Sequence, residues 1–184
     1  MIPFSETTAV LISKEVCYQR EVLDSITRHP FKTFVICTSC PDVATQFSLS
    51  TQVRTPFVYW QDDDAICQIG PLMRLADPAK LNCAMSTHYL ESYKDSKCAL
   101  LGWGSVFSIE LLHRVKPYVA TYGTDALWHR EAGRILSYLC FDVQNRIRLE
   151  HVDMPWATAP DRLSMQPDHY ANKAEVEARC ALLV

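Results

Sequence analysis

Short apolar runs alternate with amphipathic segments along the first part of the chain, and this alternation predicts its fold. Residues 14–28 carry apolar side chains at helical spacing among charged ones, and a shorter helix is expected at 43–48. The runs around these helices have the length and β propensity of buried strands, and they lie at 9–13, 33–37 and 57–60. Strands that alternate with helices predict a parallel sheet covered by helices.

The remaining residues continue the same pattern. Pro117 is expected to end one of the helices, and residues 155–170, which are rich in Pro, Asp and Met, are expected to form a loop. Further strands are expected at 81–86, within 99–107 and at 147–152, and further helices at 71–76, 108–115, 125–139 and 172–183. We therefore expect one compact α/β domain over residues 1–184, doubly wound with a mostly parallel sheet, in which residues 155–184 form a closing loop and helix.

The composition is that of an ordinary globular protein. Of 184 residues, 48% are hydrophobic and 21% charged, and the net charge is −3. This balance argues against a surface that binds nucleic acid throughout, although it leaves a local basic groove open. The first residues lack the basic and apolar pattern of a secretory leader, and no apolar stretch approaches about 18 residues, so we expect no membrane span.

The eight cysteines point to the same kind of protein. Most lie inside apolar runs, where a free cysteine behaves as a small core residue. Cys37 and Cys40 form a C-x-x-C pair, but no second pair completes a zinc site. We expect reduced thiols and a cytoplasmic protein, in the host cytoplasm if the protein is viral.

The most informative segment is residues 57–64, which read F-V-Y-W-Q-D-D-D. An apolar strand ends there in the consecutive carboxylates Asp62, Asp63 and Asp64, which repel one another. A divalent cation offsets this repulsion and prefers oxygen ligands. A solvated acidic turn is the alternative. Because ligands of open α/β sheets bind beyond the carboxyl ends of the strands, the segments 13–20, 38–42 and 62–64 are expected to meet at one site.

The strand followed by Q-D-D-D resembles the D-x-D motif of nucleotide-sugar glycosyltransferases with the GT-A fold. The resemblance implies that Asp62 and Asp64 bind Mn²⁺ or Mg²⁺, which bridges the diphosphate of a UDP-sugar such as UDP-glucose. It also implies donor contacts for Gln61, Asp62 and Asp63. The chain is short for this fold, which leaves little room for an acceptor domain.

Other segments occur in the order that such enzymes use. Tyr18 and Arg20 follow the first strand, where the family holds the nucleotide. Gly102-Trp103-Gly104 resembles the family's glycine-containing turn beside the donor, since glycine lets the backbone approach a ligand. A surface arginine and a plain turn are the alternatives.

The resemblance also assigns roles in the second half of the chain. Asp125, which opens the longest expected helix, matches the family's general base, although an N-cap role alone explains it. His169 is implied as the third metal ligand, with His151 as the alternative. The phosphate partners implied beside them are Arg162 and Lys173.

The pattern Y-x-R, V-Y-W-Q-D-D-D, G-W-G-S and D-A-L-W-H-R-E-A is similar to small phage and viral glycosyltransferases of modified DNA bases. It implies an acceptor hydroxyl on a 5-hydroxymethylated pyrimidine in double-stranded DNA; a saccharide, a protein or a small molecule is the alternative. Four arginines would then contact phosphates, and three tryptophans would stack on an extruded base: Arg130, Arg134, Arg146 and Arg148, with Trp103, Trp128 and Trp156.

Two other classes of function compete with glycosyl transfer. A nucleotidyltransferase also joins such a sheet to acidic metal ligands, but residues 9–20 lack the glycine-rich phosphate loop that it usually needs. A non-catalytic nucleotide-binding module would bind the nucleotide and release no product. The sugar, the stereochemical outcome and the oligomeric state stay open.

Overall fold

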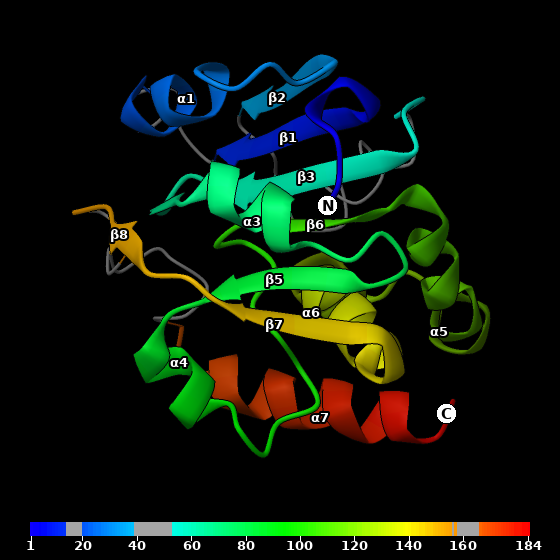
Figure 1. Ribbon diagram of the computed structural model, residues 1–184. Coiled ribbons are helices and arrows are strands. Elements are labelled where there is room, and N and C mark those ends of the chain that lie inside the picture. Colours follow the sequence, from blue (N-terminus) through cyan, green and yellow to red (C-terminus); the bar gives the residue numbers. More distant parts are fainter. Residues whose placement is uncertain (14–19, 39–52, 156, 158–165) are drawn as a thin grey trace.

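A six-stranded mixed sheet runs through the molecule in the order β2-β1-β3-β6-β5-β7 (Figure 1). The computed structural model describes residues 1–13, 20–38, 53–155, 157 and 166–184. Strand β6 is antiparallel to both neighbours, and the other five strands run in one direction. The strands are β1 (Thr7–Ser13), β2 (Thr33–Thr38), β3 (Phe57–Asp62), β5 (Leu81–Met85), β6 (Ser105–Ser108) and β7 (Gln144–Arg148).

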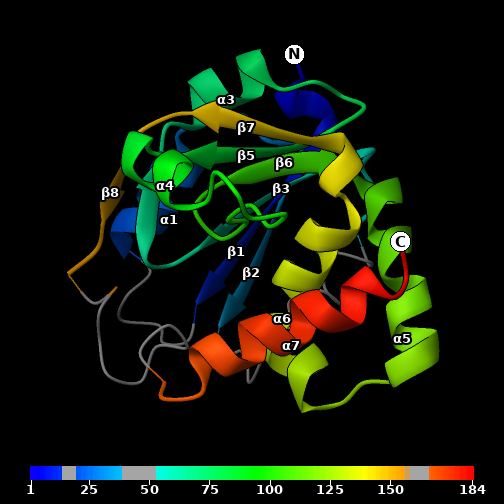
Figure 2. The same cartoon turned by 90° about the horizontal axis from the view of Figure 1, so that it is seen from below.

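Helices cover both faces of this sheet, and Figure 2 shows α3 on one side and α5, α6 and α7 on the other. Alternate residues of β3 face the two sides, so Trp60 packs toward α6 and α7 while Tyr59 packs toward α1 and α3. The α-helices are α1 (Arg20–Thr27), α3 (Ile69–Leu75), α4 (Thr87–Ser92), α5 (Lys116–Tyr122), α6 (Ala126–Leu139) and α7 (His169–Ala181). The expected doubly wound, mostly parallel α/β fold is confirmed.

Several boundaries differ from the sequence prediction. Pro117 does not end a helix: η3 (Ile109–Val115) is a 3₁₀ helix, and Pro117 lies in the first turn of α5, where proline costs no hydrogen bond. The single strand expected at 147–152 is divided, because β8 (His151–Asp153) leaves the main sheet and pairs with β4 (Ala65–Cys67). The helix expected at 43–48 lies outside the described residues.

The carboxyl ends of β1, β3, β5 and β7 meet at one edge of the sheet, on the left in Figure 1. Ile12 near the end of β1 lies beside Asp62 at the end of β3. The two-stranded sheet of β4 and β8 lies at this edge as well. The fold therefore places the acidic segment where ligands of α/β sheets bind.

The cysteines that the structure describes fully are core residues. Cys67, Cys83, Cys98, Cys140 and Cys180 are buried and free, and burial raises the pKa of each of these thiols. Cys37 and Cys40 lie in or beside a part of the chain that is not described. None of the helices in the described ranges combines the length and apolar character that a membrane crossing requires.

Candidate active site at the carboxyl edge of the sheet

The acid turn, which we define as Asp62, Asp63 and Asp64, joins β3 to β4. Burial alternates along it: Asp63 is 1% exposed, whereas Asp62 and Asp64 are partly exposed. The two outer carboxylates therefore reach the surface on either side of an inward one. This is the arrangement that a D-x-D motif requires.

Gln61 supports this turn from inside the protein. Its side chain is 0% exposed, accepts a hydrogen bond from the Tyr59 hydroxyl and donates one to the Ala65 carbonyl at 2.7 Å. Asp63, which is also an expected donor contact, is buried as well. Both side chains are buried and shape the turn, because a polar side chain that leaves the surface needs partners inside the protein.

The Gly102-Trp103-Gly104 segment, which precedes β6, lies directly against the acid turn. The Asp62 amide donates to the Gly102 carbonyl at 2.7 Å, and a Cβ atom at Gly102 would lie 2.0 Å from Asp62 Oδ2. Gly104 has a φ of 99°, and a Cβ atom there would lie 2.4 Å from Cys67 Sγ. Both glycines are thus required by close contacts, and the structure brings the expected glycine turn to the acids.

Three aromatic side chains form a group beside the same turn. The rings of Trp103 and His151 have centroids 4.5 Å apart, and those of Trp103 and Tyr89 are 4.1 Å apart. His151 Nε2 lies 3.0 Å from Asp153 Oδ1, and Asp153 pairs with Ala65 across the β4–β8 sheet. Burial raises the pKa of the Tyr89 hydroxyl, with smaller contributions from nearby carboxylates that include Asp64. His151 therefore lies near the acid turn.

His169 lies among basic side chains at the start of α7. It is the first residue of α7, and burial together with Lys173, Arg134 and Arg130 lowers its pKa to about 4. Across the described ranges, no group of three His, Cys, Asp or Glu side chains is arranged to hold a metal ion. His169 as a third metal ligand stays a prediction.

Charged side chains near His169 form a matched set, which we call the α6–α7 network. Arg130 forms a bidentate pair with Asp168, and Arg134 Nη1 lies 3.1 Å from Glu177 Oε1. Arg134 also lies 3.6 Å from Glu131, which is buried at a kink in α6. The network members are Arg130, Glu131, Arg134, Asp168, Lys173 and Glu177. These arginines stabilise the packing of α7 on α6.

Other expected nucleic-acid contacts are also used within the fold. Arg146 donates to the carbonyls of Tyr93, Ser96 and Cys98. Trp128 is 8% exposed and packs in the core, so it presents no face to a base. Of the expected group, Arg148 and Trp103 keep exposed surface, and Trp156 lies outside the described residues.

Asp125 is the N-cap of α6, which was the alternative to a general base in the sequence prediction. Its Oδ1 accepts from the Trp128 amide at 3.0 Å, and its Oδ2 accepts from Arg179 of α7. Burial acts to raise the pKa of Asp125, but these two donors outweigh it and the net pKa is lowered. A general base works best with a pKa near neutrality, so this environment favours a structural role.

Arg20 opens α1 after the end of β1 and is exposed, at the same edge as the acid turn. Lys173, a member of the α6–α7 network, has its Nζ 3.4 Å from the Tyr93 hydroxyl and over the Tyr170 ring. Tyr18 and Arg162, the other expected nucleotide contacts, lie outside the described residues.

Asp62 and Asp64 fit a hard divalent cation. Mg²⁺ and similar ions are commonly bound by one or two carboxylates together with substrate phosphates, and they keep several waters. Such a site needs no third protein ligand.

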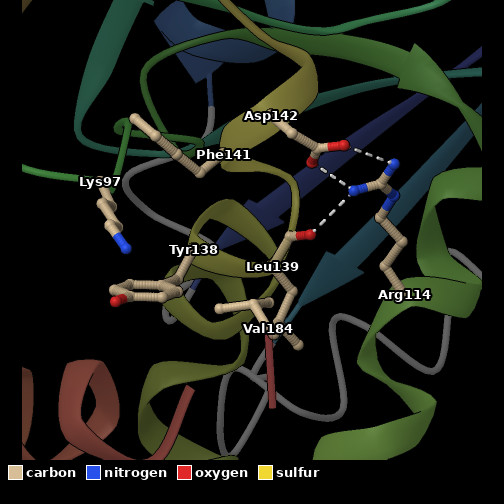
Figure 3. Close-up of a pocket in the computed structure, with 7 residues that line it drawn as sticks. All are labelled: Lys97, Arg114, Tyr138, Leu139, Phe141, Asp142 and Val184. Atoms are coloured by element: carbon tan, nitrogen blue, oxygen red, sulfur yellow. Dashed lines mark hydrogen bonds and ion pairs between the residues drawn. The ribbon is translucent and has the colours of Figure 1, made fainter. Parts of the chain in front are cut away.

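A pocket of about 380 Å³ lies near the amino end of β7, at the opposite end of that strand from the carboxyl edge (Figure 3). Arg114 donates to both oxygens of Asp142 and to the Leu139 carbonyl, so these charges satisfy each other. Lys97 lies over the Tyr138 and Phe141 rings, 5.2 and 5.8 Å from their centroids. The chemistry of the acid turn is absent from this pocket's lining, and we assign the candidate active site to the carboxyl edge.

The sheet order defines a mixed α/β fold that the chain shares with a solved structure. Among solved structures, the chain is similar to glucosyl-3-phosphoglycerate synthase from Mycobacterium tuberculosis, determined with Mn²⁺, UDP-glucose and phosphoglyceric acid. The match has a TM-score of 0.51 at 12% identity and covers 96% of this chain and 80% of that one. No protein-family model and no curated protein sequence matches the chain.

Proposed function

We propose that this protein is a metal-dependent glycosyltransferase that moves a hexose from a UDP-sugar to a hydroxyl group. One observation carries the proposal: Asp62 and Asp64 are partly exposed at the carboxyl edge of a sheet whose fold is shared with a UDP-glucose enzyme. UDP-glucose is the donor that this likeness favours, and Mn²⁺ or Mg²⁺ is the cation.

In the reaction, the bond between the anomeric carbon and the diphosphate oxygen breaks, and the acceptor oxygen bonds to that carbon. The cation supplies positive charge to the leaving diphosphate. Asp62 and Asp64 would hold it at the end of β3. Arg20 lies on the β1 side of the acid turn, and we propose it as a contact for the nucleotide.

Several assignments from the sequence stay predictions. Tyr18 and Arg162 are predicted to contact the nucleotide. A third metal ligand, if the cation has one, is predicted at His169 or at His151, and His151 lies near the acid turn. The group that takes the acceptor proton is predicted to be Asp125, and its pairing with Arg179 makes that residue a weak base.

The acceptor lies on the β6 side of the acid turn in this proposal, beside Trp103 and Tyr89. Aromatic faces suit a pyranose ring or a base. The hydroxymethylated pyrimidine of DNA remains the specific hypothesis from the sequence. Trp103 supports it, whereas the internal contacts of Arg130, Arg134 and Arg146 weaken the expected phosphate strip.

A direct test measures UDP release from UDP-glucose with Mn²⁺, with and without EDTA. We expect release with the metal and none with EDTA. The acceptor arms are hydroxymethylated duplex DNA, the same duplex unmodified, and a panel of small hydroxyl compounds, each analysed for an added hexose by mass spectrometry. A product that retains nucleoside monophosphate would indicate nucleotidyl transfer, and binding of UDP without any product would indicate a binding module.

The Asp64→Ala variant tests the cation assignment. We expect it to lower kcat/KM by about 100-fold or more, because the charge of the leaving diphosphate is then poorly offset. Asp142→Asn is the matched control, since Asp142 is an exposed acid at the opposite edge. If Asp64→Ala keeps full activity with Mn²⁺ present, the assignment is wrong.

A further inference from the structure

Trp60 and Asp62 lie on the same side of β3, because alternate residues of a strand face the same way. Trp60 is 2% exposed and belongs to the core between the sheet and α6. Its indole Nε1–H donates to Asp62 Oδ1 at 3.2 Å. The buried indole thus contacts the first carboxylate of the acid turn directly.

Gly102 holds the same residue from a second direction. Its carbonyl accepts the Asp62 amide at 2.7 Å, and its Cα faces Asp62 Oδ2 so closely that no side chain fits there. The backbone of Asp62 and one oxygen of its carboxylate are therefore both fixed. The two oxygens of a carboxylate offer about four lone-pair sites, so the indole N–H does not by itself fill them.

We propose that Trp60 is a positioning residue for the cation. Its indole N–H orients the Asp62 carboxylate before the metal arrives, so less rotamer freedom is lost on binding. Trp60 itself touches no ligand because it is buried. This inference rests on the proposed function and adds to it a residue that neither the D-x-D pattern nor the fold assigns.

Trp60→Phe tests the inference, because phenylalanine keeps an aromatic ring and removes the donor. Trp128→Phe is the matched control: Trp128 is a second tryptophan of the same core and lies on α6 rather than on β3. Calorimetry measures UDP affinity with and without Mn²⁺. We expect Trp60→Phe to weaken Mn²⁺-dependent binding about 10-fold, as loss of a metal-orienting partner does. Metal-free UDP affinity should not change, and Trp128→Phe should bind as wild type does in both conditions.

The outcomes separate this inference from the function on which it rests. Wild-type binding in Trp60→Phe, or an equal loss in Trp128→Phe, overturns the positioning role and leaves the glycosyltransferase proposal standing. A wild-type protein that binds no UDP with Mn²⁺ removes both.

A second readout needs no catalysis. The indole N–H resonance of Trp60, identified by its loss in Trp60→Phe, should shift when Mg²⁺ and UDP are added together. Asp62→Asn should remove most of that shift, because the indole then no longer faces a metal-bound carboxylate. A Trp60 resonance that is insensitive to Mg²⁺ and UDP contradicts the proposal.

Discussion

Two groups of charged residues in this molecule are organised in opposite ways. In the α6–α7 network, cations and carboxylates are matched: Arg130 pairs with Asp168, and Arg134 lies between Glu131 and Glu177. The acid turn instead places three carboxylates in consecutive residues. Of these, Asp63 is buried, whereas Asp62 and Asp64 are partly exposed at the surface.

The contrast is between charges that are paired within the fold and carboxylates that are proposed to bind a cation. Matched pairs between two helices contribute to how the helices pack, and their charges are used within the fold. Carboxylates crowded at the end of a strand repel one another and gain nothing locally from the arrangement. The proposed cation would offset this repulsion. The comparison therefore predicts that changes at the acid turn alter activity, whereas changes in the network alter stability.

Gly102→Ala is expected to lower activity about as much as the loss of an acid-turn carboxylate does. The new methyl group would lie 2.0 Å from Asp62 Oδ2, so the carboxylate must move. A displacement of about 1 Å at a catalytic group costs on the order of 100-fold in rate, and we expect kcat/KM to fall by about that factor. Steady-state kinetics with saturating Mn²⁺ measures the change.

Gly133→Ala is the control for Gly102→Ala. Gly133 lies within α6, and the nearest atom to its Cβ position is 3.8 Å away, on Leu101. Alanine fits there and favours the helix, so we expect stability to rise by about 0.5–1 kcal/mol with activity unchanged. Full activity in Gly102→Ala would show that the position of Asp62 does not matter.

Arg134→Met breaks the α6–α7 network and leaves the acid turn intact. The Arg134 side chain is 10% exposed, and its removal leaves the buried Glu131 carboxylate without its nearest cation. We expect a loss of about 2 kcal/mol in the free energy of unfolding, measured by urea denaturation, with kcat/KM unchanged well below the transition. The double variant with Glu131→Gln should recover part of the loss. A selective loss of activity would instead place the network in the active site.

Much of the fold was predictable because its signals are local. The apolar runs at 9–13, 33–37 and 57–60 predicted β1, β2 and β3, and the acid turn lies at the end of β3, as expected. The contact between Gly102 and Asp62 was only partly predictable. It depends on β6 returning antiparallel beside β3, and a distant strand pairing leaves no periodic signal in the sequence.

The assignments in the second half of the chain depended on residue type, and residue type does not reveal partners. His169, Lys173 and Arg134 are predicted contacts for a metal or a phosphate, and residue type could not reveal that they lie where α7 packs on α6. The burial of Gln61 was equally hidden, because a polar residue at the end of a strand is more often exposed.

Asp125→Asn gives the smallest and most discriminating change, because Asp125 is both the predicted general base and an observed helix cap. Asparagine is as good an N-cap as aspartate, so the variant removes the charge and keeps the cap. The pair with Arg179 is partly exposed, and we expect a loss of about 0.5–1 kcal/mol in the free energy of unfolding.

The stability contributed by Asp125 should depend on pH. An aspartate with a lowered pKa stabilises the fold above its unfolded pKa and loses that contribution as the pH falls through its folded value. The difference in the free energy of unfolding between the wild type and Asp125→Asn should therefore be constant from pH 5 to 8 and disappear below about pH 4. Urea denaturation across this range measures it.

The value of kcat at pH 7 tests whether Asp125 takes part in the reaction. Unchanged kcat assigns Asp125 to the fold, whereas a fall of 100-fold or more would restore it as the general base and move the active site toward α6.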